Sequence, residues 1–303
     1  MALSDNTKGA LLMALAMAAF TCNDAVIKAV SPYLNVGQIM MLRGSMTLVL
    51  VYLIARRMGA IRPPSVLLQP MLLLRVCFEI GAALLYVTAL GQIPLSNAAS
   101  ILQSLPLAVT LGAAIFLREP VGWRRWAAIV VGFIGVMIII RPGPEGFTIA
   151  SLYCVTCVFF TAARDLVTTR ISADVPSLTV TLYTTAGNAF FGGLLIVPLG
   201  GWQPISAFTL GMLALASLLV LVGYQSIVMA MRTGEISFIA PFRYTSLLWA
   251  IGLGMVFFAE RPDLWSITGA VIVICSGLYT FSRERKRAAR LAMGQESLPG
   301  SPL

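Results

Sequence analysis

The feature that most constrains this chain is a succession of apolar segments, each close to twenty residues long. A membrane-spanning helix needs about 20 mostly apolar residues. Lipid offers no partner for backbone N–H and C=O groups, so spans of this kind form helices and not open sheets. Ten segments can be traced, at roughly 9–30, 35–55, 69–91, 94–117, 123–141, 147–169, 176–199, 205–231, 234–258 and 264–282. We therefore predict an all-α integral membrane protein with ten transmembrane helices.

Composition excludes several classes of function. The 303 residues are 58% hydrophobic and 11% charged, with a mean hydropathy of +0.89, whereas soluble domains carry about 25% charged residues. The net charge of +9 comes from sites at the ends of apolar segments. A nucleic-acid partner is therefore not expected, because it would need a basic face on a soluble domain. The chain has no histidine, which removes imidazole metal sites and Ser-His-Asp triads; we expect no metal and no cofactor.

Lysine and arginine predict the orientation in the membrane. If the N-terminus is inside, fourteen basic residues face the cytoplasm and only Arg141 and Arg261 lie in outer loops, which is a strong positive-inside bias. Both termini are then cytoplasmic in a bacterial inner membrane. The basic segment 283–303 is predicted to be a stop-transfer anchor with a disordered cytoplasmic tail; lipid head-group binding is the alternative.

The chain contains an internal repeat. Residues 89–136 align with 230–277 at a constant offset of 141, which pairs Glu119 with Glu260 and Phe116 with Phe257. This divides the chain into two five-helix halves, 9–141 and 147–282. Five is odd, so the second half must enter the membrane from the opposite side. Inverted repeats are typical of alternating-access transporters, whose substrate site lies between the repeats near the midplane.

Ionisable residues inside the spans mark the candidate site. Arg75 and Glu79 lie four residues apart in one apolar segment, as do Asp24 and Lys28, so each pair can meet on one helix face. A charge at that depth costs at least about 2.5 kcal/mol, so it normally faces a polar cavity and is paired. We expect these residues to line a solute pathway. Lys28 lies near a span end, where it is equally well an interfacial anchor.

Other arginines have no evident partner in the sequence. Arg43 and Arg243 must find a carboxylate on another helix or on a substrate, and Arg164 is either functional or an anchor. The core set sums to +1 and comprises Asp24, Arg43, Arg75, Glu79 and Arg243. This surplus favours a ligand with an anionic or zwitterionic group, because arginine binds carboxylates and phosphates bidentately. The alternative is a closed ionic network that only joins helices.

Polar and aromatic residues accompany the charges. Tyr86 is seven residues beyond Glu79, and the repeat aligns Gln103 with Tyr244. With Tyr224, these side chains would suit an aromatic or heterocyclic solute, although Tyr near span ends also forms interfacial belts. No nucleotide-binding motif is present, so energy comes from gradients; Asp24 or Glu79 is the candidate proton carrier. The glycine-containing spans five and ten are expected at the periphery, as packing or homodimer-forming helices.

The turn at Leu117-Arg118-Glu119-Pro120, its counterpart Glu260-Arg261-Pro262, and the two five-span halves resemble the EamA family of the drug/metabolite transporter superfamily. The resemblance covers about residues 9 to 282. It implies a central cavity formed by spans one to four and six to nine, with no enzymatic activity. Arg43, Arg75, Glu79 and Phe242-Arg243-Tyr244 are similar to the branch of S-adenosylmethionine and riboflavin transporters.

The leading interpretation is a secondary transporter or facilitator for a small polar metabolite, either zwitterionic or anionic or heteroaromatic. Its substrate-binding residues would be Arg43, Arg75, Glu79, Tyr86, Gln103, Tyr224, Arg243 and Tyr244. Export of amino acids or organic anions is the alternative within the same class. An intramembrane lipid enzyme is a remote alternative, since the carboxylates are scattered and histidine is absent. A scaffolding membrane protein is the third class.

Overall fold

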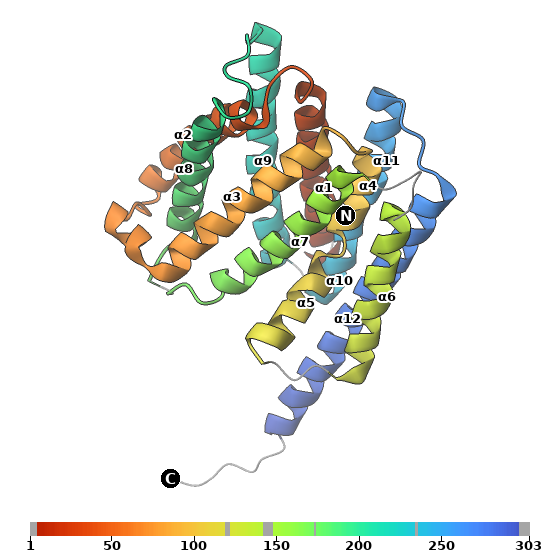
Figure 1. The fold of residues 1–303 in the computed structure, drawn as a ribbon. Coiled ribbons are helices and arrows are strands. Elements are labelled where there is room, and N and C mark those ends of the chain that lie inside the picture. The colour runs from red at the N-terminus through yellow and green to blue at the C-terminus, as the bar shows by residue number, and fades with distance from the viewer. Residues whose placement is uncertain (1–4, 119–121, 142–147, 173, 234–235, 297–303) are drawn as a thin grey trace.

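The computed structural model describes residues 5–118, 122–141, 148–172, 174–233 and 236–296, and every regular element in these ranges is a helix (Figure 1). The first half contains α1 (Asp5–Val30), α2 (Val36–Arg57), the 3₁₀ helix η1 (Pro64–Leu68), α3 (Pro70–Leu90), α4 (Leu95–Leu102), α5 (Leu105–Phe116) and α6 (Trp123–Ile140). The second half contains α7 (Ile149–Thr168), α8 (Ser177–Leu195), α9 (Ala207–Thr233), α10 (Ile236–Ile239), the 3₁₀ helix η2 (Ala240–Tyr244), α11 (Thr245–Phe258) and α12 (Leu264–Glu296).

Eight helical segments of the described chain are long and apolar enough to cross a membrane. They include the combined segments Leu95–Phe116 and Ala240–Phe258. The fifth expected span corresponds to a shorter apolar helix, Trp126–Ile140. The seventh corresponds to α8, which is outside the eight because Ser, Thr and Asn residues dilute its apolar character. The all-α membrane architecture is therefore confirmed, and the count of ten spans remains a prediction.

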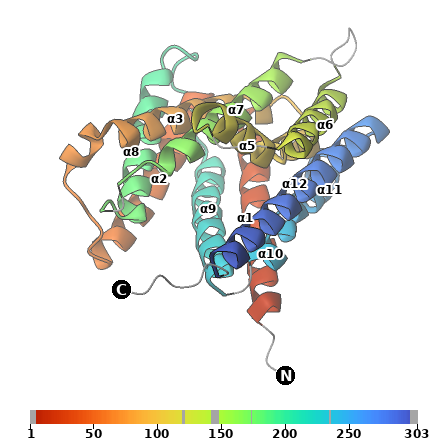
Figure 2. The ribbon, with the colours of Figure 1, turned by 90° about the horizontal axis from the view of Figure 1, so that it is seen from below.

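Helices from the two halves pack against each other in a regular pattern. The main pairs are α1 with α9, α2 with α8, α3 with α7, and α6 with α12, and α4 packs on α11 (Figures 1 and 2). Exchanging each helix for its counterpart five spans along reproduces the same set of pairs. The pair of α1 with α9 exchanges with the pair of α3 with α7, and the other three pairs map onto themselves. Helices at corresponding positions in the two halves therefore make corresponding contacts.

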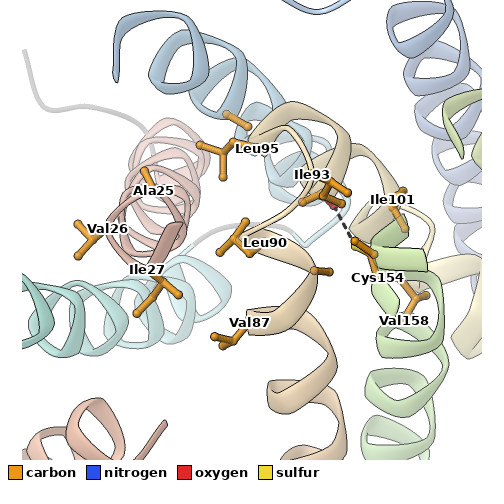
Figure 3. Packing of buried hydrophobic residues seen from close by; sticks show 14 of the residues in the cluster. Ala25, Val26, Ile27, Val87, Leu90, Ile93, Leu95, Ile101, Cys154 and Val158 are labelled. Atoms are coloured by element: carbon orange, nitrogen blue, oxygen red, sulfur yellow. Dashed lines mark hydrogen bonds between the residues drawn. The ribbon is translucent and has the colours of Figure 1, made fainter. Parts of the chain in front are cut away.

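The largest buried apolar cluster joins the ends of several spans. Figure 3 shows labelled members of this cluster from four helices, among them Ile27 of α1, Leu90 of α3, Leu95 of α4 and Val158 of α7. Cys154 lies in the same cluster and its thiol points to the Ala98 carbonyl, 3.9 Å away. Cys154 is a free thiol, so this half of the C-x-x-C sequence packs helices together. The cluster fixes one end of the bundle around the polar interior.

The fourth and ninth expected spans are both broken. In the fourth span, the helix is interrupted between α4 and α5 at Gln103, just before Pro106. In the ninth span, the 3₁₀ helix η2, which contains Pro241, precedes α11. Proline lacks a backbone N–H and clashes with the preceding turn, so it interrupts an α-helix. The two breaks occupy equivalent positions in the repeat and touch: Gln103 Nε2 donates to Ser246 Oγ over 2.7 Å. Discontinuous helices at corresponding positions are a common feature of transporter sites.

The ends of the two halves differ in what the structure describes. The chain after residue 282 was expected to be disordered, but α12 continues as a helix to Glu296. The segment is rich in Arg, Ala, Leu and Met, which have high helix propensity, so the helix extends beyond the end of the apolar span. The Glu119-Pro120 turn, which helped to reveal the repeat, lies outside the described residues.

Candidate functional site

The first polar group centres on Arg164 of α7. Its guanidinium bonds Glu79 of α3 over 2.7 Å and Asp165 over 2.7 Å, and Arg164 and Glu79 are each 19% exposed. We expected Glu79 to pair with Arg75, and this is wrong. Arginine placed N-terminal to glutamate is the less favourable order within one helix, and α7 packs directly on α3. Arg164 is thus part of the interior and not an interfacial anchor.

Arg75 and Arg43 have no comparable partner. Arg75 Nη1 donates to Thr184 Oγ1 of α8 over 2.7 Å, and Arg43 Nη1 lies 3.4 Å from Asn23 Oδ1. Among the described residues, no carboxylate is within ion-pair distance of either guanidinium. Both Nε groups are buried without a hydrogen-bond partner, as is Asn188 Oδ1. Buried polar groups are normally paired, so each of these atoms is available to a further partner.

Asp24 of α1 is held by neutral donors. The Tyr86 hydroxyl of α3 donates to Asp24 Oδ2 over 2.8 Å, and Asn23 Nδ2 donates to Oδ1 over 3.0 Å. The expected pair between Asp24 and Lys28 is therefore wrong. Asp24 still lies within electrostatic range of Arg43, so Tyr86 and Asp24 belong to the same polar interior.

Tyr224 of α9 completes this interior. Its hydroxyl is within electrostatic range of Arg43, Arg75 and Arg164, and its ring meets the Phe20 ring edge-on, with centroids 5.2 Å apart. About half of the Tyr224 surface, 51%, remains accessible. An accessible aromatic ring can accept a planar ring by edge or face contact.

The charge balance of this group differs from the expected surplus. The interior group consists of Asp24, Arg43, Arg75, Glu79, Arg164 and Asp165, in which three arginines balance three carboxylates. The three carboxylates are nonetheless distributed unequally among the arginines, because Arg164 pairs with both Glu79 and Asp165. Locally, Arg43 and Arg75 present positive charge, while the group as a whole is neutral.

The other three sequence-predicted residues lie in a second group at the helix breaks. Gln103 contacts Ser246 and the Arg243 carbonyl, the latter at 3.5 Å. The Arg243 side chain is exposed, and the described part of the chain provides no ion-pair partner for it. Tyr244 lies against Gly277 of α12. No hydrogen bond or ion pair of the described residues joins Gln103, Arg243 or Tyr244 to the interior group. Helix α1 contacts both α9 and α11, and its Thr21 Oγ1 lies 3.5 Å from the Ser246 carbonyl.

An ionic network closes one end of the bundle. Lys28 Nζ pairs with Glu260 over 3.1 Å and donates to the Leu90 carbonyl at the end of α3 over 3.2 Å. Glu260 Oε2 accepts the Leu95 N–H at the start of α4 over 2.8 Å. Lys28 and Glu260 are 13% and 14% exposed. This network, which we call the Lys28–Glu260 latch, ties α1, the α3–α4 connection and the end of α11 together.

Sequence reasoning missed some members of the site. Thr184 lies one helical turn before Asn188 on α8; the sequence marks Asn188 as a polar residue of this span, but Thr184, in a region without charge, was missed. Asn23 was overlooked beside Asp24, although the pair of adjacent polar residues in a span is itself a signal.

Comparisons with known proteins find transporter relatives of this chain. The profile of the EamA-like transporter family matches residues 7–141 and 148–282. A riboflavin transporter of Vibrio cholerae is 31% identical over 222 residues, covering 72% of this chain and 73% of that protein. An S-adenosylmethionine uptake transporter of Rickettsia felis is 28% identical over 65% of this chain and 66% of its own. A pseudopaline exporter of Pseudomonas aeruginosa is 25% identical over 92% of this chain and 97% of its own.

A solved crystal structure has the same fold, with a TM-score of 0.62 at 17% identity over 93% of this chain and 99% of that chain. The named relatives are bacterial transporters and not enzymes. Together with the apolar helices, they identify a multi-pass bacterial membrane protein. Because the family profile covers nearly the whole chain in two matches, this protein belongs to the EamA-like transporter family of the drug/metabolite transporter superfamily.

Proposed function

We propose that this protein is a secondary transporter or facilitator that moves a small polar metabolite by alternating access. The observation that carries the proposal is the unpaired Nε groups of Arg43 and Arg75 inside a membrane bundle. An arginine kept in a span without a carboxylate needs a compensating partner. A transported carboxylate or phosphate would supply it through charge-assisted hydrogen bonds.

The substrate class follows from the same group. The group is neutral overall and positive only at Arg43 and Arg75, which favours a zwitterion or a monoanion over a multiply charged anion. The accessible ring of Tyr224 beside these arginines favours a heteroaromatic portion. Relatives named for riboflavin and S-adenosylmethionine fit this description, so flavin-like and nucleoside-like solutes are the first candidates.

Two inverted repeats, 9–141 and 147–282, provide the mechanism. The helix pairs that map onto themselves or each other on exchanging the halves support this arrangement. The basic residues support an inner-membrane location with both termini in the cytoplasm. The substrate would then alternate between two openings related by the repeat, with Gln103, Arg243 and Tyr244 acting at the paired helix breaks and the remaining predicted residues in the interior.

Export is the second candidate, because the relative that covers the largest share of this chain among those described above is named an exporter. An alternating-access cycle is reversible, and the gradients decide its direction. The same interior group serves both directions. Uptake and efflux assays in vesicles of defined orientation distinguish them.

The test is thermal stability of the purified protein with a panel of riboflavin, S-adenosylmethionine, aromatic amino acids and di- and tricarboxylates. A ligand that binds only the folded state raises the melting temperature. We expect a shift with a heteroaromatic or zwitterionic compound that is lost in Arg75→Gln and kept in Arg57→Gln, whose arginine is exposed at the end of α2. A folded Arg75→Gln protein with an unchanged shift would exclude the interior group as the binding site.

A further inference from the structure

The helices α6 and α12 form a pair at the edge of the bundle (Figures 1 and 2). A groove of about 480 Å³ follows their seam. Its lining includes Trp123, Arg124 and Val131 of α6, and Val271, Cys275 and Tyr279 of α12. Among the described residues that line the groove, Arg124 is the one charged residue and most of the others are apolar, whereas the interior group is built from six charged residues.

The groove has a polar end and an apolar length. The Arg124 guanidinium lies over the Trp123 ring, 5.3 Å from its centre. Ser276 donates to the Ala128 carbonyl, and Gly135 meets Gly269 further along the pair, so the two helices run antiparallel and Tyr279 lies at the same end as Trp123. Trp and Tyr gather where a membrane meets water. The valines continue from this interface along the seam into the apolar zone.

Positive charge is concentrated at this end of the helix pair. Arg118 and Arg124 precede and begin α6, and the described residues give neither an ion-pair partner. The backbone of α12 continues past Tyr279 into a segment whose sequence is basic from Arg283 onward. At the opposite end of the pair, Arg141 is neutralised by Asp263. The groove therefore opens at a basic membrane interface.

We propose that this groove binds an anionic phospholipid, with the phosphate at Arg124 and an acyl chain along Val131 and Val271. Basic pockets between transmembrane helices on the cytoplasmic side bind such head groups. The acyl chain would cover apolar side chains that a head group alone leaves exposed. A zwitterionic lipid could fill the same seam, but it brings no net charge to the basic end.

The experiment compares thermal unfolding of the purified full chain in detergent supplemented with phosphatidylglycerol or with phosphatidylcholine, and counts retained lipids by native mass spectrometry. We expect a larger upward shift with phosphatidylglycerol. Arg124→Gln should abolish the difference between the lipids, and Val131→Trp, which fills the seam without changing charge, should reduce retention of both. Arg57→Gln removes a similar exposed charge from α2 and should leave the difference intact.

Equal shifts with the two lipids in the unmodified protein would overturn the proposal. So would equal losses in Arg124→Gln and Arg57→Gln, which would indicate a diffuse surface charge effect. A second copy of the chain is the other occupant to exclude. Cys275 lines the groove and is exposed, so efficient oxidative cross-linking in phosphatidylglycerol bilayers that disappears in Cys275→Ser would assign the groove to a dimer and reject the lipid site.

Discussion

Two arginines in the same interior have different roles because their partners differ. Arg164 neutralises Glu79 and Asp165, whereas Arg75 is bonded to the hydroxyl of Thr184 and leaves a buried Nε unpaired. Removing the first leaves carboxylates without a counter-charge. Removing the second removes a charge that had no counter-charge. Substituting Arg164 should therefore mainly lower stability, whereas substituting Arg75 should mainly lower ligand affinity.

Arg164→Met should lower the free energy of unfolding by about 3 kcal/mol, because breaking a buried pair leaves an uncompensated charge. Thermal unfolding in detergent measures the loss. Adding Glu79→Gln should recover part of it, since the double variant no longer strands the Glu79 carboxylate. If the double variant is less stable than Arg164→Met, the pair is not the origin of the effect.

Arg75→Gln should retain near-normal stability and lose ligand affinity by about tenfold to a hundredfold, because a hydrogen bond to a charged group contributes about 1.5–3 kcal/mol. Equilibrium binding of the compound found in the thermal screen measures the change. Arg57→Gln, which alters an exposed arginine, is the control. A folded Arg75→Gln protein with full affinity contradicts the assignment.

At the scale of elements, close helix contacts and the Lys28–Glu260 latch set the shape of the bundle. A Cβ added at Gly37 of α2 would lie 2.8 Å from the Gly192 carbonyl oxygen and 2.9 Å from the Ile196 nitrogen of the α8 segment. These are backbone atoms, which cannot rotate away as a side chain can. Glycine at this position therefore lets the start of α2 approach the end of α8 closely.

Gly37→Val should destabilise the protein by about 1–3 kcal/mol, the usual cost of overpacking, and lower the yield of folded protein. Gly211→Ala on α9 is the matched control, because nothing lies within 4 Å of the position of its Cβ. Size-exclusion profiles and melting temperatures report both effects. An unaffected Gly37→Val protein would mean that α2 and α8 separate freely.

The latch should behave as one unit. Glu260→Gln and Lys28→Met should each lower the melting temperature, and the double variant should lose less than the sum of the two, because residues that share one interaction are not additive. Glu260 also accepts the Leu95 N–H, so Glu260→Gln should additionally weaken the start of α4. Strictly additive losses would show that Lys28 and Glu260 act independently.

At the scale of the whole molecule, the proposed transport cycle raises the question of which interior carboxylate would carry a coupled proton. Glu79 is ion-paired with Arg164. Within the described residues, Asp24 is hydrogen-bonded to Tyr86 and Asn23, which are neutral donors, and has no ion-pair partner. Of the two candidate proton carriers, Asp24 is therefore the better placed to bind and release a proton during a cycle.

Uptake into proteoliposomes should fall when an imposed pH gradient is collapsed with an ionophore. In Asp24→Asn vesicles, uptake should no longer respond to the gradient, because the side chain cannot titrate. Initial rates with radiolabelled substrate measure both. Gradient-independent uptake by the unmodified protein would identify a facilitator and remove the proton-carrier role.

The sequence by itself determined the helical membrane architecture and the ionisable residues inside the spans. Lipid offers no hydrogen-bond partners to backbone groups and no solvation to charges. The length of the apolar segments and the isolated charges within them can therefore be recognised from the sequence alone. Only the tertiary structure decided the partners: Arg164 and not Arg75 for Glu79, and Glu260 and not Asp24 for Lys28. Those pairs join helices far apart in the chain, and their geometry depends on how α3 packs on α7 and how α1 meets the end of α11. Spacing within one helix describes which residues share a face, but the neighbouring helix determines what that face meets.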